Sequence, residues 1–146
     1  MITITDLNND KENFNWWLTC MEDVLAYKCL LPLDIKKTLD YTVSSLDTLE
    51  IYILENFTSE SIFKSENKFA LDFFARYVGQ TFFKNIPNLK WSLVEDEKDF
   101  YNGKVVLEKK NTDLFIKKSP LSLVIVSLDR KKGNFISEIL VNNMKD

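Results

Sequence analysis

The sequence predicts a single α+β domain, with three N-terminal helices, a small antiparallel sheet at about residues 89–117, and one or two C-terminal helices. Apolar residues recur at helical spacing as far as Asn85, whereas the segment after Pro87 alternates as strands do and contains the turn signal Asn102-Gly103. The length of 146 residues fits one domain, and a composition of 45% apolar residues supplies a core. With only three glycines and three prolines, the connections should be short.

The first helix is expected over residues 11–28, with Asp10 as its N-cap. A second set of side chains, Trp16, Cys20 and Tyr27, lies on another face of this helix, which predicts that it packs on two sides. The main apolar stripe consists of Phe14, Trp17, Leu18, Met21, Val24 and Leu25.

The next two helices are expected to be central. One runs from Tyr41 to Phe57, and the other begins at Ser65 and runs to about Asn85. Gly79 lies inside the latter, where glycine costs about 1 kcal/mol relative to alanine. We therefore expect another backbone to approach this glycine closely.

Short strands are expected at residues 90–94, 104–108 and 114–116, with Asn102-Gly103 turning the chain between the first two. Together they predict the antiparallel sheet.

The C-terminal segment begins with Ser119 as a cap and Pro120 at the first helical position. Apolar residues at helical spacing favour a helix over residues 121–130, although the run Val-Ile-Val is typical of a strand and keeps that alternative open. After Gly133, residues 135–141 are expected to form a last short helix.

The chain contains no histidine, which removes Ser-His-Asp and Cys-His catalysis and most transition-metal sites. No phosphate-binding loop, dinucleotide glycine pattern or GxSxG motif is present. We therefore predict a non-enzyme with no catalytic residue, no cofactor and no metal. An enzyme built on an unfamiliar carboxylate site is the remaining catalytic alternative.

A cluster of carboxylates precedes the predicted hairpin turn: Glu95, Asp96, Glu97 and Asp99. The spacing lacks the alternation of a calcium-binding loop. A solvated loop is the ordinary interpretation of such a cluster. The functional one is a protein-binding edge, with Tyr101 as an aromatic anchor.

Glu50 and Arg76 lie on two predicted core helices, and we expect them to form a buried ion pair that fixes the helix register. The functional alternative groups them with Tyr77 and Gln80 in a buried polar site.

The overall charge of -3 and pI of about 5.1 argue against a nucleic-acid partner and fit a basic protein partner better. The N-terminus has no signal-peptide pattern, and the longest apolar stretch, residues 121–128, is too short to span a membrane. A cytoplasmic protein is expected.

Cys20 and Cys29 match no zinc or redox spacing and are expected to be free, mostly buried thiols.

Two segments together are similar to a group of small uncharacterised bacterial proteins. Residues 40–50 read DYTVSSLDTLE and resemble the group's DYSxxSLxxLE helix, and residues 75–80 read ARYVGQ, followed by Trp91, and resemble its ARYxGE…W segment. Residues 119–121 resemble its later helix start. Gln80 stands where the group usually has glutamate, and Asn-Leu replaces a Gly-Gly turn.

Some members of this group resemble immunity proteins that lie beside bacterial toxins. The resemblance therefore implies that the chain binds and neutralises a toxin directly, and the acidic charge suits a basic toxin domain. The alternative is a structural or oligomeric interaction module without a toxin partner, and a homo-oligomer is one form that it could take.

Overall fold

The computed structural model describes residues 2–27, 31–112 and 117–145, and its architecture confirms the predicted α+β fold. Helices make up most of these residues, and the strands form one two-stranded antiparallel sheet. Three short 3-10 turns also occur, at Ile4–Asp6, Ser61–Phe63 and Ser65–Asn67. The other elements are α1 (Lys11–Thr19), α2 (Met21–Tyr27), α3 (Leu33–Lys36), α4 (Val43–Asn56), α5 (Lys68–Asn85), β1 (Leu89–Leu93), β2 (Val105–Lys109), α6 (Pro120–Arg130) and α7 (Phe135–Met144).

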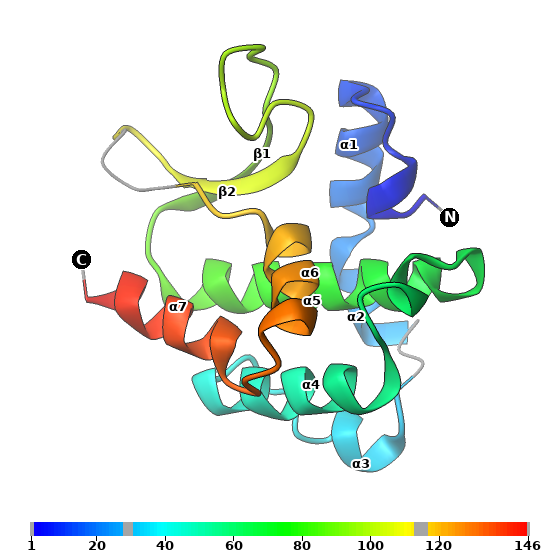
Figure 1. The fold of residues 1–146 in the computed structure, drawn as a ribbon. Helices are drawn as coiled ribbons and strands as arrows, with labels where there is room; N and C mark the ends of the chain where they lie inside the picture. The colour runs from blue at the N-terminus through cyan, green and yellow to red at the C-terminus, as the bar shows by residue number, and fades with distance from the viewer. Residues whose placement is uncertain (1, 28–30, 113–116, 146) are drawn as a thin grey trace.

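Helix α5 is the centre of the molecule, and every residue from Leu71 to Phe82 is buried. Figure 1 shows α5 crossing the middle of the molecule, with α4 along one side and the sheet on the opposite side. Phe74 packs edge-on against Tyr52 and Phe57 at the α4 end. A helix buried on nearly all sides must satisfy its polar residues internally, which decides the roles of Asp72 and Arg76 described below.

The first predicted helix is divided at Cys20 into α1 and α2. Asp10 caps α1 as expected, because its carboxylate accepts hydrogen bonds from the backbone N–H groups of residues 12 and 13. The predicted second buried face is wrong: Trp16 is 60% exposed and Tyr27 is 80% exposed. The opposite stripe, which includes Trp17, supplies the burial that holds these helices to the core. Cys20 is a half-buried free thiol, and Cys29 lies outside the described residues.

Gly79 is explained by a side chain and not by the backbone contact that we expected. A Cβ atom at this position would overlap the indole ring of Trp91 and would approach Pro120 Cγ to 3.0 Å. Glycine therefore lets the ring from β1 and the first turn of α6 pack directly on the backbone of α5.

The sheet consists of β1 and β2 in antiparallel register, with Leu93 opposite Val105 and Leu89 opposite Lys109. The hairpin is confirmed, but its connection is the long loop of residues 94–104, and Asn102-Gly103 lies at the end of this loop with Gly103 at φ 81°. The third predicted strand, residues 114–116, lies outside the described residues.

The segment 121–130 is helical, as the favoured alternative predicted. Ser119 accepts a hydrogen bond from Ser122 N, and Pro120 starts the helix. Capping and the burial of residues at helical spacing outweigh the strand preference of the β-branched run. Among the described residues, no helix is both long enough and apolar enough to cross a membrane.

Candidate functional site

Glu50 is fully buried, but its partner is the start of α7 and not Arg76. Its two carboxylate oxygens accept hydrogen bonds from the backbone N–H groups of Phe135, at 3.1 Å, and Ile136, at 2.9 Å. One turn earlier on α4, Asp47 accepts a 2.5 Å hydrogen bond from the Ser137 hydroxyl. The two carboxylates therefore fasten α7 to α4, and Glu50 satisfies two N–H groups that have no partner within α7 itself.

Arg76 is also fully buried, and it pairs with Asp72 one turn earlier on the same helix, with Nε and Oδ2 2.7 Å apart. Arg76 Nη1 donates to the carbonyl oxygen of Trp17 at 2.8 Å, and the guanidinium lies 4.3 Å from the Trp17 ring centre. The predicted Glu50–Arg76 pair is therefore wrong. Each charge was correctly expected to be buried, but Arg76 pairs with an i,i+4 partner on its own helix and Glu50 bonds to the start of α7.

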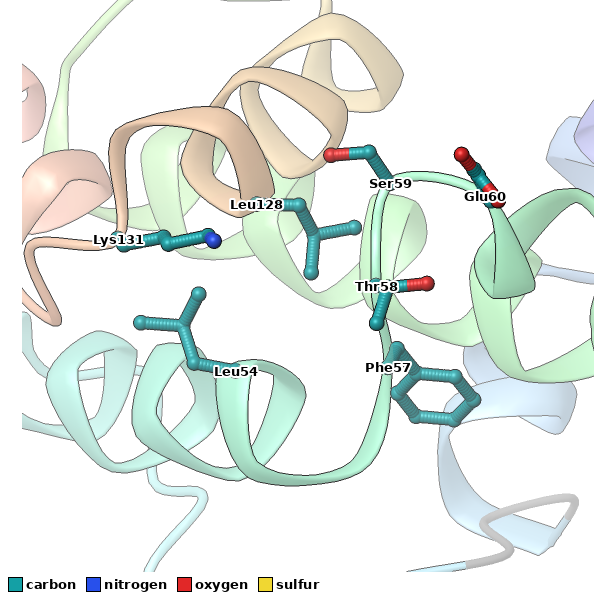
Figure 2. A pocket seen from close by; sticks show the side chains of 7 residues that line it. All are labelled: Leu54, Phe57, Thr58, Ser59, Glu60, Leu128 and Lys131. Atoms are coloured by element: carbon teal, nitrogen blue, oxygen red, sulfur yellow. The ribbon is translucent and has the colours of Figure 1, made fainter.

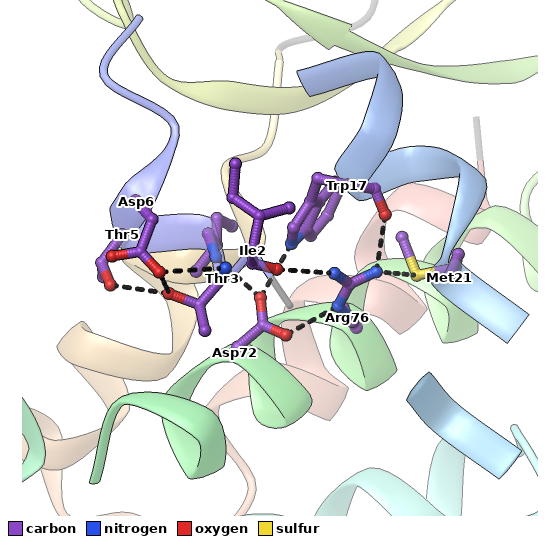
Figure 3. Close-up of polar contacts among 9 residues, drawn as sticks. Ile2, Thr3, Thr5, Asp6, Trp17, Met21, Asp72 and Arg76 are labelled. Carbon is purple, nitrogen blue, oxygen red and sulfur yellow. Dashed lines mark hydrogen bonds and ion pairs between the residues drawn. The ribbon is translucent and has the colours of Figure 1, made fainter. Parts of the chain in front are cut away.

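Asp72 completes this polar cluster, which Figure 3 shows in full. Its Oδ1 accepts two hydrogen bonds of 2.7 Å, one from Ile4 N and one from Trp17 Nε1. Among the described residues, no buried side-chain nitrogen or oxygen lacks a hydrogen-bond partner. The cluster therefore has no free group for chemistry, and its role is to fix the N-terminal segment and α1 on α5.

The other two members of the alternative polar site also have structural partners. The Tyr77 hydroxyl is hydrogen bonded to Ser45 Oγ at 2.7 Å, and burial raises the pKa of Tyr77. Gln80 accepts a hydrogen bond from Trp91 Nε1 and donates one to Glu22. An amide can make both contacts, whereas a glutamate here would place a carboxylate against the carboxylate of Glu22. The four residues do not converge on one site.

The acidic segment lies in the loop between β1 and β2, hereafter the acidic loop (residues 94–104). Glu95, Asp96 and Glu97 are exposed, as a binding edge requires. Asp99 is different, because it accepts hydrogen bonds from Lys117 Nζ at 2.5 Å and from Tyr101 N at 2.8 Å. The hydrogen bond from Lys117 holds the pKa of Asp99 below its usual value.

The aromatic side chain that the acidic loop exposes most is Phe100, which sequence reasoning missed. It is 84% exposed, whereas the predicted anchor Tyr101 is half-buried and packs edge-on against it with ring centres 5.1 Å apart. The adjacent pair Phe100-Tyr101 was the available signal, since two successive aromatics at a turn cannot both face the protein.

The acidic loop is braced by its own backbone. Val94 and Gly103 close its base, with Gly103 N donating to Val94 O at 2.8 Å and Val94 N donating to Lys104 O at 3.0 Å. Turns inside it are closed by bonds from Asp99 N to Asp96 O and from Asn102 N to Asp99 O. The exposed side chains are therefore presented on an ordered frame, which lowers the entropy lost on binding.

A hollow of about 680 Å³ lies between the C-terminal ends of α4 and α6, and nothing in the sequence predicted it. Figure 2 shows its aliphatic floor and the Lys131 side chain reaching into it from the end of α6. It is lined by Leu54, Phe57, Thr58, Ser59, Glu60, Leu128 and Lys131. Its volume lies in the range of small-molecule sites.

Within the described parts of the chain, no three carboxylate or thiol groups are placed to hold a metal ion.

Comparisons with known proteins find no counterpart: no family model, no curated protein and no solved structure matches the chain.

Proposed function

We propose that this chain is a non-catalytic protein that binds a basic protein partner through the acidic loop, and that the partner is a bacterial toxin domain that it neutralises. The toxin is suggested by the sequence resemblance of residues 40–50 and 75–80 to a group with immunity-like members. The binding surface is suggested by the loop itself.

The observation that carries the proposal is the exposure of Phe100. A phenylalanine side chain that is 84% exposed contributes nothing to the core, and burying it against a partner gives roughly 1.5–3 kcal/mol. Glu95, Asp96 and Glu97 lie in the same loop, and none of them forms an ion pair within 4.0 Å among the described residues. An apolar anchor with a charged rim is the arrangement found in protein–protein interfaces.

The rim carboxylates are expected to act on the rate of association more than on the final affinity. Exposed charges attract an oppositely charged partner over roughly a Debye length, about 8 Å at physiological ionic strength. Phe100 is expected to act on the rate of dissociation, since its contact forms only in the docked complex.

The test begins with affinity capture from the native host, followed by coexpression of the captured protein to measure whether the chain suppresses its toxicity. Association is then compared for wild type, for Glu95→Lys/Glu97→Lys, and for Glu55→Lys/Glu66→Lys. The control pair makes the same charge change at exposed positions outside the acidic loop.

The loop reversal should slow association about 10-fold at low salt and flatten its salt dependence, while the free energy of unfolding changes by less than about 0.5 kcal/mol. Phe100→Ala should speed dissociation. Equal association rates for the two charge variants would place the interface elsewhere. A captured partner that is not toxic would leave a binding protein without an immunity function.

Self-association is the second candidate function, and the exposed aromatics of α1 and α2 favour it. Trp16 is 60% exposed and Tyr27 is 80% exposed, and such side chains are enriched at interface centres. Sedimentation velocity over a range of concentrations tests this directly. Concentration-dependent dimers that Trp16→Ser disperses would support an oligomeric module, whereas a monomer at all concentrations would exclude it.

A further inference from the structure

The hollow between α4 and α6 combines an apolar floor with one ammonium group. Leu54 and Phe57 from the end of α4 and Leu128 from α6 form the floor, and Leu128 is nearly fully buried. In Figure 2 the Lys131 side chain extends over this floor, with its Nζ directed between Leu54 and Leu128. The hollow thus has an apolar surface with a positive charge at one end.

The backbone of Lys131 has a defined conformation at the end of α6. It ends α6 in the left-handed conformation, at φ 55° and ψ 39°, and its N–H donates to Ser127 O at 3.0 Å. Its neighbour Lys132 forms a 2.8 Å ion pair with Glu138, but the part of the chain that the structure describes gives the Lys131 ammonium no ion-pair partner. Lys131 is an exposed residue, so its ammonium is accessible from solvent and can form a charge-assisted hydrogen bond with a bound anion.

We propose that this hollow binds a monocarboxylate with an aliphatic body, with the carboxylate on Lys131 and the body on Leu54 and Leu128. The site lies outside the acidic loop and does not depend on the proposed function. Its volume of about 680 Å³ accepts a small molecule or the last residue of a peptide.

Two carboxylates lie near the hollow. Asp129 is bonded within the protein, and Glu60 limits which anions can bind. Asp129 accepts a 2.6 Å hydrogen bond from the Ser59 hydroxyl, which occupies one of its oxygens and ties the loop after α4 to α6. Glu60 lies at the opposite end from Lys131 in Figure 2. A ligand with a second carboxylate at its far end would therefore meet Glu60, so a dicarboxylate should bind worse than a monocarboxylate of the same length.

The test is an NMR titration of protein labelled with carbon-13 in its leucine methyl groups, read at Leu54 and Leu128. Hexanoate is compared with hexanol, hexylammonium and adipate. For an acid with eight non-hydrogen atoms, a Kd of roughly 1 mM is expected, and the three other ligands should bind more weakly. Lys131→Gln should weaken hexanoate binding about 3- to 5-fold, and Lys132→Gln, the matched control, should leave it unchanged.

A second pair of titrations separates the two sources of such a carboxylate. The peptide N-acetyl-Ala-Ala-Leu with a free C-terminus is compared with its C-terminal amide. Tighter binding of the acid than of the amide, and than of hexanoate, would identify a peptide C-terminus as the ligand. Binding of hexanoate alone would identify a small acid.

Three results would overturn the proposal. Absence of saturable shifts at both leucines with hexanoate and with the peptide acid would show that the hollow takes no carboxylate. Equal binding of hexanoate and hexanol would show that only apolar contact matters. Equal weakening by Lys131→Gln and Lys132→Gln would show a diffuse charge effect rather than a site. The proposed partner binding can fail or succeed independently, because no residue of the acidic loop is changed.

Discussion

Helix α5 and the acidic loop both carry charged and aromatic side chains, but they use them in opposite ways. On α5, Asp72 and Arg76 are fully buried and each bonds to other elements, including the N-terminal segment and α1. In the acidic loop, the backbone bonds are local, and Glu95 and Phe100 point outward. The charges of α5 hold the fold together, whereas those of the loop are available to a partner.

The two regions differ in how much free energy of unfolding is lost when one member of an ion pair is removed. A buried charge that loses its counterion remains in a medium of low polarity, so the free energy of the folded state rises by several kcal/mol. An exposed charge that loses its counterion regains water and loses little. Substitutions in the two regions should therefore separate stability from binding.

The largest expected effect is that of Arg76→Ala. It leaves Asp72 buried without its 2.7 Å partner and should lower the free energy of unfolding by about 3–5 kcal/mol. Lys132→Ala, which breaks an exposed ion pair, should change it by less than about 0.5 kcal/mol. Urea denaturation measures both. Similar small losses would show that the Asp72–Arg76 cluster is open to water and that the contrast between the regions is not real.

A smaller effect is expected from Glu50→Gln. The amide retains one acceptor oxygen but turns an NH₂ group toward a backbone N–H of α7, so the loss should be about 2 kcal/mol. Glu55→Gln on the exposed face of α4 is the control. Hydrogen exchange should show Phe135 and Ile136 losing protection first. Uniform loss of protection over the whole chain would mean that Glu50 supports the core generally and not the start of α7.

The sequence predicted the helices and the hairpin because helical spacing and turn residues are local signals. The cap at Asp10, the helix start at Ser119-Pro120 and the hairpin around Asn102-Gly103 all agree with the structure. The division of the first helix at Cys20 was missed, because apolar spacing continues through the break.

Pairing between elements was harder to predict. Burial of Glu50 and Arg76 follows from their position on apolar faces, but their partners depend on how the helices cross and where α7 begins. The i,i+4 spacing of Asp72 and Arg76 was visible in the sequence and is the simplest pair to consider. The hollow beside Lys131 could not be predicted, since it is formed by the ends of two helices brought together only by the fold.

The exposure of the acidic segment was predictable from its charge. Which of its carboxylates forms an ion pair within the protein was not predictable. Asp99 differs from Glu95 and Glu97 because the ammonium of Lys117, 18 residues later in the chain, donates a hydrogen bond to its carboxylate. The hydrogen bond from Lys117 makes Asp99 unavailable to a partner. It also shifts the pKa of Asp99, which can be measured to test whether the loop is ordered.

The smallest expected effect concerns the pKa of Asp99. The hydrogen bond from Lys117 Nζ lowers the pKa of Asp99 from its ordinary value of 3.8, and the bond from Tyr101 N lowers it further. A carboxyl group whose pKa is lower in the folded state contributes stability above its unfolded pKa. That contribution is lost as the pH falls through the folded-state pKa. Because both members of the Asp99–Lys117 pair keep contact with solvent, the expected change in the free energy of unfolding is small, and the pKa of Asp99 is the better observable.

Carbon-13 NMR of the Asp99 carboxyl group during an acid titration measures this directly. In the wild type, Asp99 should titrate below 3.8, and Lys117→Met should return its pKa most of the way to that value while the Tyr101 bond keeps part of the shift. Lys98→Met, a change at a neighbouring exposed lysine, should leave the pKa of Asp99 almost unchanged. If Asp99 titrates at the same pH in all three proteins, Lys117 does not brace the acidic loop in solution. Phe100 would then be presented on a mobile segment, and partner binding would carry an ordering cost that the braced loop avoids.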